Sequence, residues 1–253
     1  MSIAIDLAHK VVLITGASQG IGAQMARTFH AAGATAVLNH PDVGCTRADA
    51  ARLVAELNAA RAGSARAEVA DVADAAAVQA MMARVRGEFG GIDFLINNAA
   101  IIRDRTVAKM SLEEWQAVID VNLSGVFHCC KFGLEIMRDG GAIVSLGSIA
   151  AIQGFYGQAN YAAAKSGVQA MMRVVAREAA RRGIRANAIA PGVIETAMAA
   201  TIPEAVRAEM LKHIPLARFG APADVAHVAL FLCSPLAAYV SGQTIEVNGG
   251  WRG

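Results

Sequence analysis

The sequence predicts an α/β fold in which a doubly wound parallel sheet of about seven strands carries helices on both faces. Short apolar runs, each sufficient for one buried strand, alternate along the chain with segments whose apolar residues recur every three to four positions. Strands separated by helices return in the same direction through right-handed crossovers, which makes the sheet parallel. Gly and Pro fall at the ends of these elements and no linker or repeat divides the chain, so we expect one domain over residues 1–253.

The first strand is expected at residues 11–14, and Ile21, Met25 and Phe29 lie on one face of the helix that follows it. Ser111 followed by Glu114 forms a capping box, which predicts the start of a long helix that runs towards Met137. The remaining strands are expected at residues 36–38, 67–69, 92–96, 142–146, 184–190 and 244–247, and the remaining helices around residues 51–60, 78–89, 164–175, 203–213 and 223–233.

Composition excludes several classes of function. A chain of 253 residues that is 55% hydrophobic can bury a sizeable core. Its 23 basic and 21 acidic residues are scattered, without a basic block that could follow a nucleic-acid backbone. The first ten residues do not resemble a signal peptide and charges interrupt every long apolar run, so we expect a cytoplasmic protein with no membrane span. The four cysteines show no repeated Cys-x-x-Cys pattern, so we expect free thiols and no metal.

A glycine-rich turn follows the first strand. It contains Gly16, Ser18, Gln19, Gly20, Ile21 and Gly22. Glycine lets the backbone approach a pyrophosphate closely while the next helix presents its positive N-terminus. The spacing Gly-x-x-x-Gly-x-Gly differs from the Gly-x-Gly-x-x-Gly fingerprint, and such a turn can also simply join a strand to a helix. Its position between a strand and a helix favours dinucleotide binding on a Rossmann-type sheet.

Two further strand ends carry candidate cofactor contacts. Asp71 and Val72 follow the third strand, where a carboxylate would lie near the adenine; the alternative is a loop or helix-cap aspartate. Asn98 and Ala99 follow the fourth strand, and small and amide residues suit either a backbone pressed against a ribose or a tight turn.

The end of the second strand predicts the choice of dinucleotide. A carboxylate there holds the ribose hydroxyls of NAD, whereas a basic group accepts the 2'-phosphate of NADP. The residues present are Asn39 and His40, which favours NADP(H) because the first residue after the strand is not acidic. Neither Gln19 nor Asn39 carries a positive charge, and Asp42 is near, so NAD(H) stays possible.

Ser148, Tyr161 and Lys165 are the candidate catalytic residues. Tyr161 and Lys165 are one helical turn apart on the same face, and Ser148 follows the fifth strand. A tyrosine with a pKa of about 10 exchanges protons readily near neutral pH only if its anion is stabilised, and Lys165 supplies a stabilising charge. The alternative is an ordinary amphipathic helix with its polar tips in water.

In motif content and order the chain resembles the short-chain dehydrogenase/reductase family from Lys10 to Trp251. The resemblance rests on the glycine-rich turn, Asn97-Asn98-Ala99, Asn122, Ser148, Tyr161-x-x-x-Lys165 and Pro191-Gly192. It implies that a hydride moves between NAD(P)(H) and a ketone or secondary alcohol, with Tyr161 as the proton donor and Ser148 bonded to the substrate oxygen. It also implies that Lys165 binds the nicotinamide ribose and lowers the pKa of Tyr161, and that Asn122 anchors a water. For Asn122 the alternative is an amide that kinks a helix.

The resemblance assigns roles to the segment after the sixth strand as well. The residues placed near the nicotinamide carboxamide are Pro191, Gly192, Ile194 and Thr196. The stretch 197–213 would then be a substrate lid, and its Ala, Met and Ile content suggests an apolar pocket. The alternative for Pro191-Gly192 is a simple turn.

Within the family, the chain is most similar to 3-oxoacyl-[acyl-carrier-protein] reductases and acetoacetyl-CoA reductases, on residues 103–104, 157–165, 194–196, 214–215, 218–220 and 247–250. This implies a 3-oxoacyl thioester or similar β-keto substrate and a homotetramer built through two long helices and the C-terminal segment. Arg182 matches a basic position that meets an acidic carrier protein, but Asp139 would repel one. A secondary alcohol dehydrogenase or carbonyl reductase for small free substrates is the alternative, and a non-catalytic dinucleotide sensor or scaffold is the alternative of another class.

Overall fold

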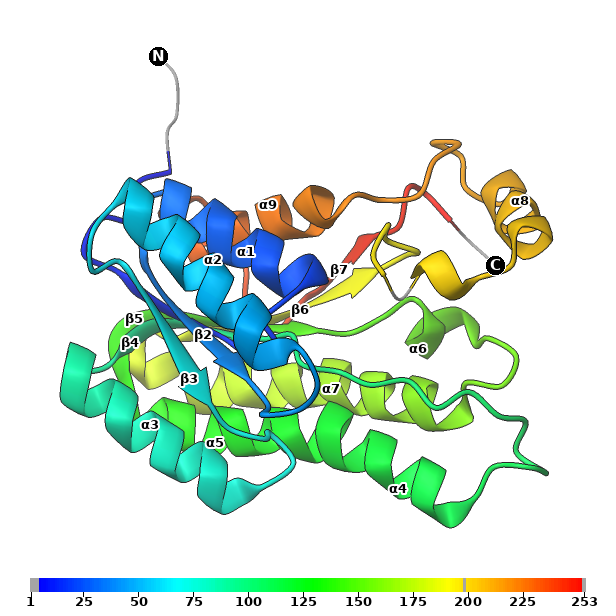
Figure 1. Ribbon diagram of the computed structural model, residues 1–253, viewed down its shortest axis with the longest axis horizontal. Coiled ribbons are helices and arrows are strands. Elements are labelled where there is room, and N and C mark those ends of the chain that lie inside the picture. The colour runs from blue at the N-terminus through cyan, green and yellow to red at the C-terminus, as the bar shows by residue number, and fades with distance from the viewer. Residues whose placement is uncertain (1–4, 198, 252–253) are drawn as a thin grey trace.

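The computed structural model describes residues 5–197 and 199–251, and its strands form one parallel sheet in the order β3-β2-β1-β4-β5-β6-β7 (Figure 1). The strands are β1 (Val11–Ile14), β2 (Thr35–His40), β3 (Ala65–Val69), β4 (Ile92–Asn97), β5 (Met137–Leu146), β6 (Arg185–Pro191) and β7 (Thr244–Val247). Every neighbouring pair runs parallel. The predicted doubly wound α/β sheet is therefore confirmed.

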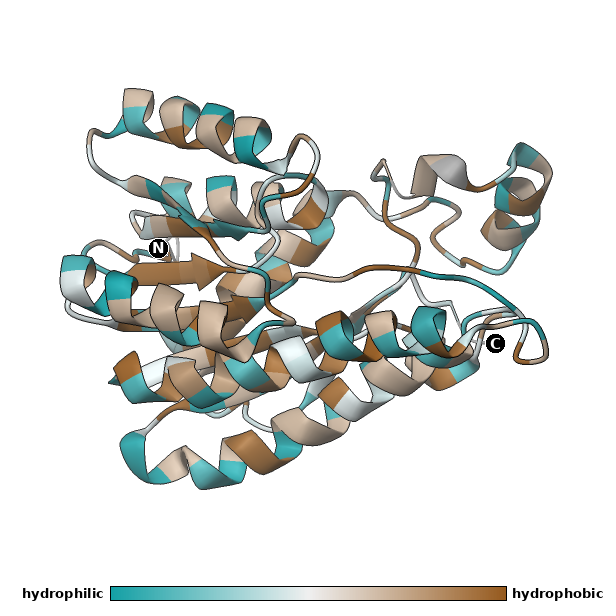
Figure 2. Ribbon diagram, turned by 60° about the horizontal axis from the view of Figure 1, so that its bottom comes forward, coloured by the Kyte–Doolittle hydropathy of each residue, from teal (hydrophilic) through white to brown (hydrophobic). Residues whose placement is uncertain are grey.

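Helices cover both faces of this sheet (Figure 1). The first face carries α1 (Gly20–Ala31), α2 (Thr46–Ala60) and α9 (Pro222–Cys233); the second carries α3 (Ala75–Phe89), α4 (Leu112–Ile119), α5 (Gly125–Ile136) and α7 (Ala159–Glu178). Strand β1 shows why helices must cover both faces, because all four of its residues are buried. Val12 and Ile14 pack into the core beneath α1, whereas Val11 and Leu13 pack into the core beneath α3 and α5. The strands accordingly appear as the hydrophobic centre of the molecule in Figure 2.

The predicted long helix after Ser111 differs in one respect from the structure. Its capping box is present, with Glu114 N donating to Ser111 Oγ at 3.1 Å and Ser111 N donating to Glu114 Oε2 at 3.1 Å. Between α4 and α5, however, Asp120–Ser124 forms a π-helical turn. Such a turn inserts an extra residue and frequently marks a functional site. Strand β5 then begins at Met137, five residues before the predicted start at 142.

Shorter elements lie around the carboxyl ends of the strands. Helix α6 (Ala150–Gln153) was not predicted, and α8 (Glu204–Lys212) follows a 3₁₀ turn at Ala199–Thr201. The other 3₁₀ turns are Ala180–Arg182 and Pro235–Ala237. A small third core joins this region, made of Ile149, Ile214, Phe219 and Trp251.

None of the helices in the described ranges combines the length and apolar content that a bilayer crossing requires. All four cysteines carry free thiols: Cys45 is exposed, and Cys129, Cys130 and Cys233 are buried.

Candidate active site

The order of the strands defines the edge of the sheet at which a site forms. The chain winds outward from β1 through β2 and β3, and then in the opposite direction from β4 through β7. Parallel sheets of this kind bind ligands in the crevice outside the carboxyl ends of the strands where the direction reverses, here between β1 and β4. The predicted residues after β1, β4, β5 and β6 all lie at this edge.

The glycine-rich turn fits a dinucleotide pyrophosphate. Gly16 and Gly20 have positive φ angles of 62° and 57°. A Cβ on Gly16 would lie 2.8 Å from Ala99 Cα, and one on Gly22 would lie 2.5 Å from Gly16 O, so neither site accepts a side chain. Gln19 occupies the N-cap of α1 without a side-chain hydrogen bond, which leaves the first N–H groups of α1 directed outward. Ser18 is buried in this turn, and Ile21 is partly buried.

Asn98 and Ala99 hold the glycine-rich turn in place. Asn98 Nδ2 donates to Thr15 O at 2.9 Å and to Gly16 O at 3.0 Å. Thr15 Oγ1 in return accepts from Asn98 N and from Ala99 N, both at 3.0 Å. Thr15 directly precedes the glycine-rich turn but was not among the predicted site residues, although a hydroxyl at the end of a buried strand is a signal that could have found it. The Asn98 amide therefore acts on the protein backbone, while Ala99 lies directly beside Gly16.

The end of β2 differs from the sequence-based expectation. The Asn39 side chain is wholly buried and points towards β3, where Nδ2 donates to Ala70 O at 2.9 Å and to Glu68 O at 3.3 Å. His40 is also buried, and its Nδ1 lies 2.9 Å from Pro41 O. The structure does not bring either side chain to the surface of the crevice, because both lie within the paired part of β2.

A basic group is nevertheless present close to the end of β2. Arg47, in the first turn of α2, pairs with Asp42 through two bonds, Nε to Oδ1 at 2.8 Å and Nη2 to Oδ2 at 2.5 Å. Both side chains are exposed. This guanidinium holds the pKa of the Asp42 carboxyl below its usual range.

Asp71 and Val72, the predicted contacts after β3, differ in exposure. Asp71 is exposed, and its Oδ1 accepts from Ala73 N at 3.0 Å, so its carboxylate shapes the turn before α3. Val72 is buried against Gly125, where a Cβ would come within 2.8 Å of Val72 Cγ2. The backbone of Val72 is held to α5, because His128 Nδ1 lies 3.0 Å from Val72 O.

Helix α7 places three side chains against the segment that follows β5. Tyr161, Lys165 and Gln169 stand at intervals of four residues and share one face. Lys165 Nζ donates to Leu146 O at 2.7 Å, and Gln169 Nε2 donates to Ser148 O at 3.1 Å. Gln169 was not predicted, although it continues the same four-residue interval. The Ser148 hydroxyl accepts from Ala150 N at 3.1 Å, which fixes its oxygen at the start of α6.

The electrostatics of this group differ from the expectation that Lys165 depresses the pKa of Tyr161. Burial raises the pKa of the Tyr161 phenol to about 12, a hydrogen bond with Ser148 opposes this rise, and the Asp104 carboxylate adds to it. The Lys165 ammonium is directed at Leu146 O and lies 5.7 Å from the centroid of the Tyr161 ring. Burial lowers the pKa of Lys165 itself to about 8. Desolvation is therefore the largest cause of the pKa shift at both groups.

Asn122 lies in the π-helical turn and is wholly buried. Its Oδ1 accepts from Ile101 N and its Nδ2 donates to Ile101 O, both at 2.9 Å. The side-chain amide therefore fixes the segment after β4. A water at this position would use the second Nδ2 hydrogen, the second lone pair of Oδ1 or the backbone of the π-helical turn.

The residues after β6 line the opposite wall of the crevice. Pro191 O accepts from Ile149 N at 3.1 Å, and Gly192 N donates to Val247 O at 2.9 Å. Thr196 lies across from the glycine-rich turn, since a Cβ on Gly20 would be 3.7 Å from Thr196 Cγ2. Ile194 is buried and forms an isolated parallel bridge with Gly220.

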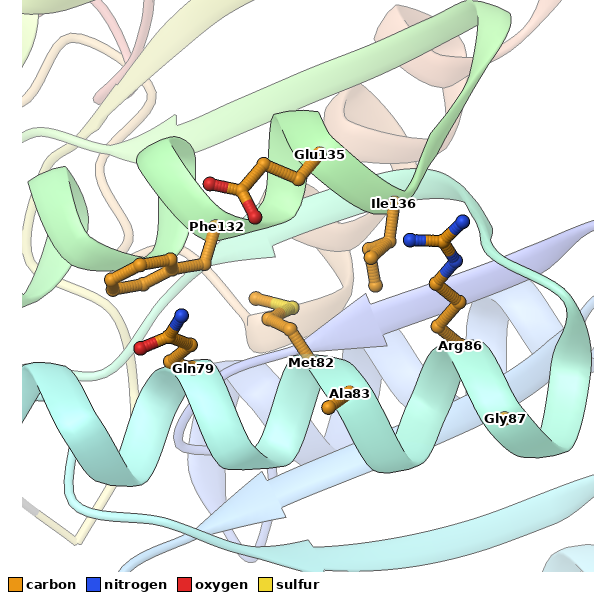
Figure 3. Close-up of a pocket in the computed structure, with 8 residues that line it drawn as sticks. All are labelled: Gln79, Met82, Ala83, Arg86, Gly87, Phe132, Glu135 and Ile136. Atoms are coloured by element: carbon orange, nitrogen blue, oxygen red, sulfur yellow. The ribbon is translucent and has the colours of Figure 1, made fainter.

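A separate hollow of about 440 Å³ lies between α3 and α5, away from these residues. Figure 3 shows Met82 and Ile136 directed into it, with the carboxylate of Glu135 above Met82 and the guanidinium of Arg86 beside Ile136. It does not contain any of the predicted catalytic residues, so we place the chemistry in the crevice. In the described part of the chain, His, Cys, Asp and Glu side chains do not form a cluster of three or more suited to a metal ion.

Comparison with known proteins identifies the class of this protein. Residues 16–252 match the family model described as Enoyl-(Acyl carrier protein) reductase. A 3-oxoacyl-[acyl-carrier-protein] reductase of Synechocystis sp. is 45% identical over 96% of this chain and 97% of its own. A short-chain dehydrogenase/reductase structure from Brucella melitensis, described as a glucose/ribitol dehydrogenase, is 36% identical with a TM-score of 0.93, over 99% of this chain and 100% of its own. The structure of a blue fluorescent protein from a metagenomic library, in complex with NADPH, is 33% identical with a TM-score of 0.92, over 98% and 100% of the two chains.

These similarities and the fold define the protein as a nicotinamide-dependent oxidoreductase that interconverts a ketone and a secondary alcohol. The chain belongs to the short-chain dehydrogenase/reductase family.

Proposed function

We propose that this enzyme reduces the keto group of a 3-oxoacyl thioester, or a similar β-keto substrate, with NADPH. The row of side chains on α7 carries the proposal, because it presents Tyr161 and Lys165 to the segment that bears Ser148, at the crevice where the glycine-rich turn lies. The similarity to 3-oxoacyl-[acyl-carrier-protein] reductases supports the substrate class.

Each proposed catalytic residue has a distinct task. Ser148 donates a hydrogen bond to the substrate carbonyl oxygen and holds it beside the Tyr161 hydroxyl. Tyr161 gives its proton to that oxygen during reduction and recovers it during oxidation. Lys165 stabilises the resulting tyrosinate through its ammonium and offers donors to the nicotinamide ribose. The bound dinucleotide supplies or accepts the hydride.

The dinucleotide would be held by the groups at the edge of the sheet. The first N–H groups of α1 would bind the pyrophosphate, beside Gly16 and Gly22. We propose that Arg47 binds the 2'-phosphate of NADP(H), since it is the guanidinium closest in sequence to the end of β2 and its Asp42 partner is solvent-exposed. The Asp42 carboxylate, which would otherwise favour NAD(H), already forms an ion pair with Arg47.

We propose that residues 197–213, of which residue 198 lies outside the described part of the chain, form the substrate lid of a single domain. Helix α8 packs through Met210 and Leu211 on the third core, which also contains Ile149, the residue after Ser148. Trp251 belongs to the same core, and its ring packs against Phe155 in a tilted arrangement with ring centroids 5.5 Å apart. Movement of α8 would therefore shift side chains that lie directly beside the catalytic Ser148.

Docking of an acyl carrier protein is not part of the proposal. Arg182 donates to Asp139 Oδ1 at 2.8 Å and to Leu134 O at 2.7 Å, so its charge is neutralised by an exposed carboxylate. An acidic carrier would meet Asp139 at this surface. This favours a thioester of a small carrier such as coenzyme A, and it keeps free ketones and secondary alcohols as a second candidate substrate class.

We also propose a cytoplasmic homotetramer. Phe127 on α5 and Val174 on α7 are each 52% exposed, so these two long helices present apolar side chains that a neighbouring subunit would cover. Leu236 and Tyr239, just before β7, are exposed as well. Free thiols, including the exposed Cys45, suit a reducing compartment.

A matrix of initial rates tests the proposal. NADPH and NADH are each combined with acetoacetyl-CoA, an acetoacetyl carrier protein, a free β-ketoester and a simple ketone, and the reverse reaction is run with secondary alcohols. We expect the highest kcat/KM with NADPH and acetoacetyl-CoA. Turnover of simple ketones or alcohols without turnover of either thioester would replace the proposed substrate by the second class. Dinucleotide binding without any turnover would instead favour the sensor role.

A further inference from the structure

The side chain of Asn160 has an environment that its neighbours on the first turn of α7 do not share. Asn160 immediately precedes Tyr161 and is wholly buried. Burying a primary amide costs free energy unless its donors and acceptor are satisfied. None of the proposed catalytic steps uses it.

Three hydrogen bonds satisfy this amide. Oδ1 accepts from Tyr161 N at 2.8 Å, and Nδ2 donates to Arg103 O at 3.0 Å and to Glu114 O at 3.3 Å. The orientation of the amide is determined by its partners, because a flipped amide would place its donors against an N–H and its oxygen against two carbonyls. One side chain thus joins the start of α7 to the segment after β4 and to the first turn of α4.

The segment after β4 is held in the same way at every second residue. Ile101 is bonded through both backbone groups to the Asn122 amide. Arg103 is bonded to Asn160, and Arg105 N donates to Gly157 O at 2.8 Å. Between them, Asp104 Oδ2 accepts from Gln158 Nε2 at 3.0 Å. Residues 103–105 are therefore bonded to the residues directly before Tyr161, and Ile101 is bonded to the π-helical turn.

We propose that Asn160 is a positioning residue, which fixes the Tyr161 hydroxyl relative to Ser148 by joining the first turn of α7 to residues 103–105. The inference rests on the proposed role of Tyr161 as proton donor. Tyr161 is the third residue of α7, in a turn that lacks the full set of helical hydrogen bonds, so its backbone depends on local partners. A displacement of about 1 Å at a reacting group can reduce a rate by about 100-fold.

Asn58 provides a matched control. Its amide also makes three bonds to backbone groups, from Nδ2 to Ala65 O at 3.0 Å and from Ser64 N and Ala65 N to Oδ1 at 2.9 Å each. These bonds join α2 to β3 at the edge of the sheet, apart from Tyr161. Asn58→Ala thus removes the same kind of bonds without altering the first turn of α7.

The experiment compares Asn160→Ala, Asn160→Asp and Asn58→Ala in the full-length enzyme. Both alanine variants should lower Tm. Only Asn160→Ala should lower kcat, by about 10- to 100-fold, with the Kd for NADPH changed less than about threefold. In Asn160→Asp the ionised carboxylate would be repelled by the two carbonyl oxygens that it faces. The protonated carboxyl group can instead donate one hydrogen bond to one of them. The kcat of Asn160→Asp relative to the unmodified enzyme should therefore rise as the pH falls, and the same ratio for Asn160→Ala should stay constant.

A measurement without turnover separates this inference from the proposed substrate. The chain has three tyrosines, so ¹³Cζ-tyrosine labelling gives three resonances, and Tyr161→Phe identifies the one from Tyr161. We expect Asn160→Ala to move or broaden this resonance and Asn58→Ala to leave it unchanged. An unchanged resonance together with a kcat equal to that of Asn58→Ala would overturn the positioning role. A moved resonance in an enzyme that reduces no β-keto substrate would overturn the proposed function and keep the positioning role.

Discussion

Lys165 Nζ donates to the carbonyl oxygen of Leu146 at 2.7 Å, which joins the middle of the catalytic helix to the last residue of β5. The side chain is 1% exposed, and a buried ammonium needs such a partner because it has lost its water. The bond satisfies one of three donors and leaves the others for the crevice. Desolvation nevertheless dominates, and it lowers the pKa of Lys165 to about 8.

This pKa predicts the pH dependence of ketone reduction. Lys165 stabilises the developing tyrosinate only while it is protonated, so kcat/KM for the dinucleotide should be constant below pH 8 and fall above about 8. Tyr161 itself should stay protonated throughout, since burial raises its pKa to about 12. Initial rates from pH 6 to 10 measure the profile, and Lys165→Arg should move the falling limb to higher pH because a guanidinium keeps its proton. A profile with the same limb in Lys165→Arg would assign the titration to another group.

Removing the phenol hydroxyl should abolish most of the turnover. Tyr161→Phe keeps the ring and its packing but removes the proton donor, so we expect kcat to fall by about 100- to 10,000-fold. The Kd for NADPH, measured by fluorescence, should change little. A kcat within about tenfold of the unmodified enzyme would exclude Tyr161 as the proton donor.

Arg47 should discriminate between the two dinucleotides. Arg47→Ala removes a guanidinium that would make charge-assisted bonds to the 2'-phosphate, and we expect the Kd for NADPH to rise by about tenfold or more. The Kd for NADH, which lacks that phosphate, should stay within about twofold. Titration calorimetry of both dinucleotides measures the difference, and Arg27→Ala, which removes an exposed guanidinium paired with Glu56, serves as the control. An equal rise in Kd for NADPH and for NADH in Arg47→Ala would contradict the assignment of Arg47 to the 2'-phosphate.

His30 should make the fold sensitive to acid. It is buried in α1, its Nε2 lies 2.7 Å from Ser64 Oγ, and burial together with the nearby Arg61 lowers its pKa. A folded-state pKa below that of the unfolded chain means that the unfolded chain binds the proton more readily. The contribution of His30 to stability is therefore complete above about pH 6.5 and is lost as the pH falls through the lowered folded-state pKa. Denaturant unfolding should show that the free energy of unfolding decreases less from pH 7.5 to 5 in His30→Gln than in the unmodified protein.

Patterns of local sequence were sufficient to predict the sheet. Strand β1 is a short apolar run that is buried on both faces, so periodicity and burial give the same answer there. The capping box of Ser111 and Glu114 was equally clear, since it depends on residues three apart. The π-helical turn at Asp120–Ser124 was not predicted, because helical periodicity does not distinguish one inserted residue within a continuous helix.

The sequence by itself determined the parallel sheet, the glycine-rich turn and the spacing of Tyr161 and Lys165, because each depends on the order of residues within one or two elements. The tertiary structure alone decided where the polar groups of the site are directed. The backbone of other strands and loops forms hydrogen bonds with the side-chain amides of Asn39, Asn98 and Asn122. A buried amide bonds to whichever partners the neighbouring elements provide. Only the packing of α7 against the end of β5 and the segment after β4 shows what Asn160 and Gln169 contact.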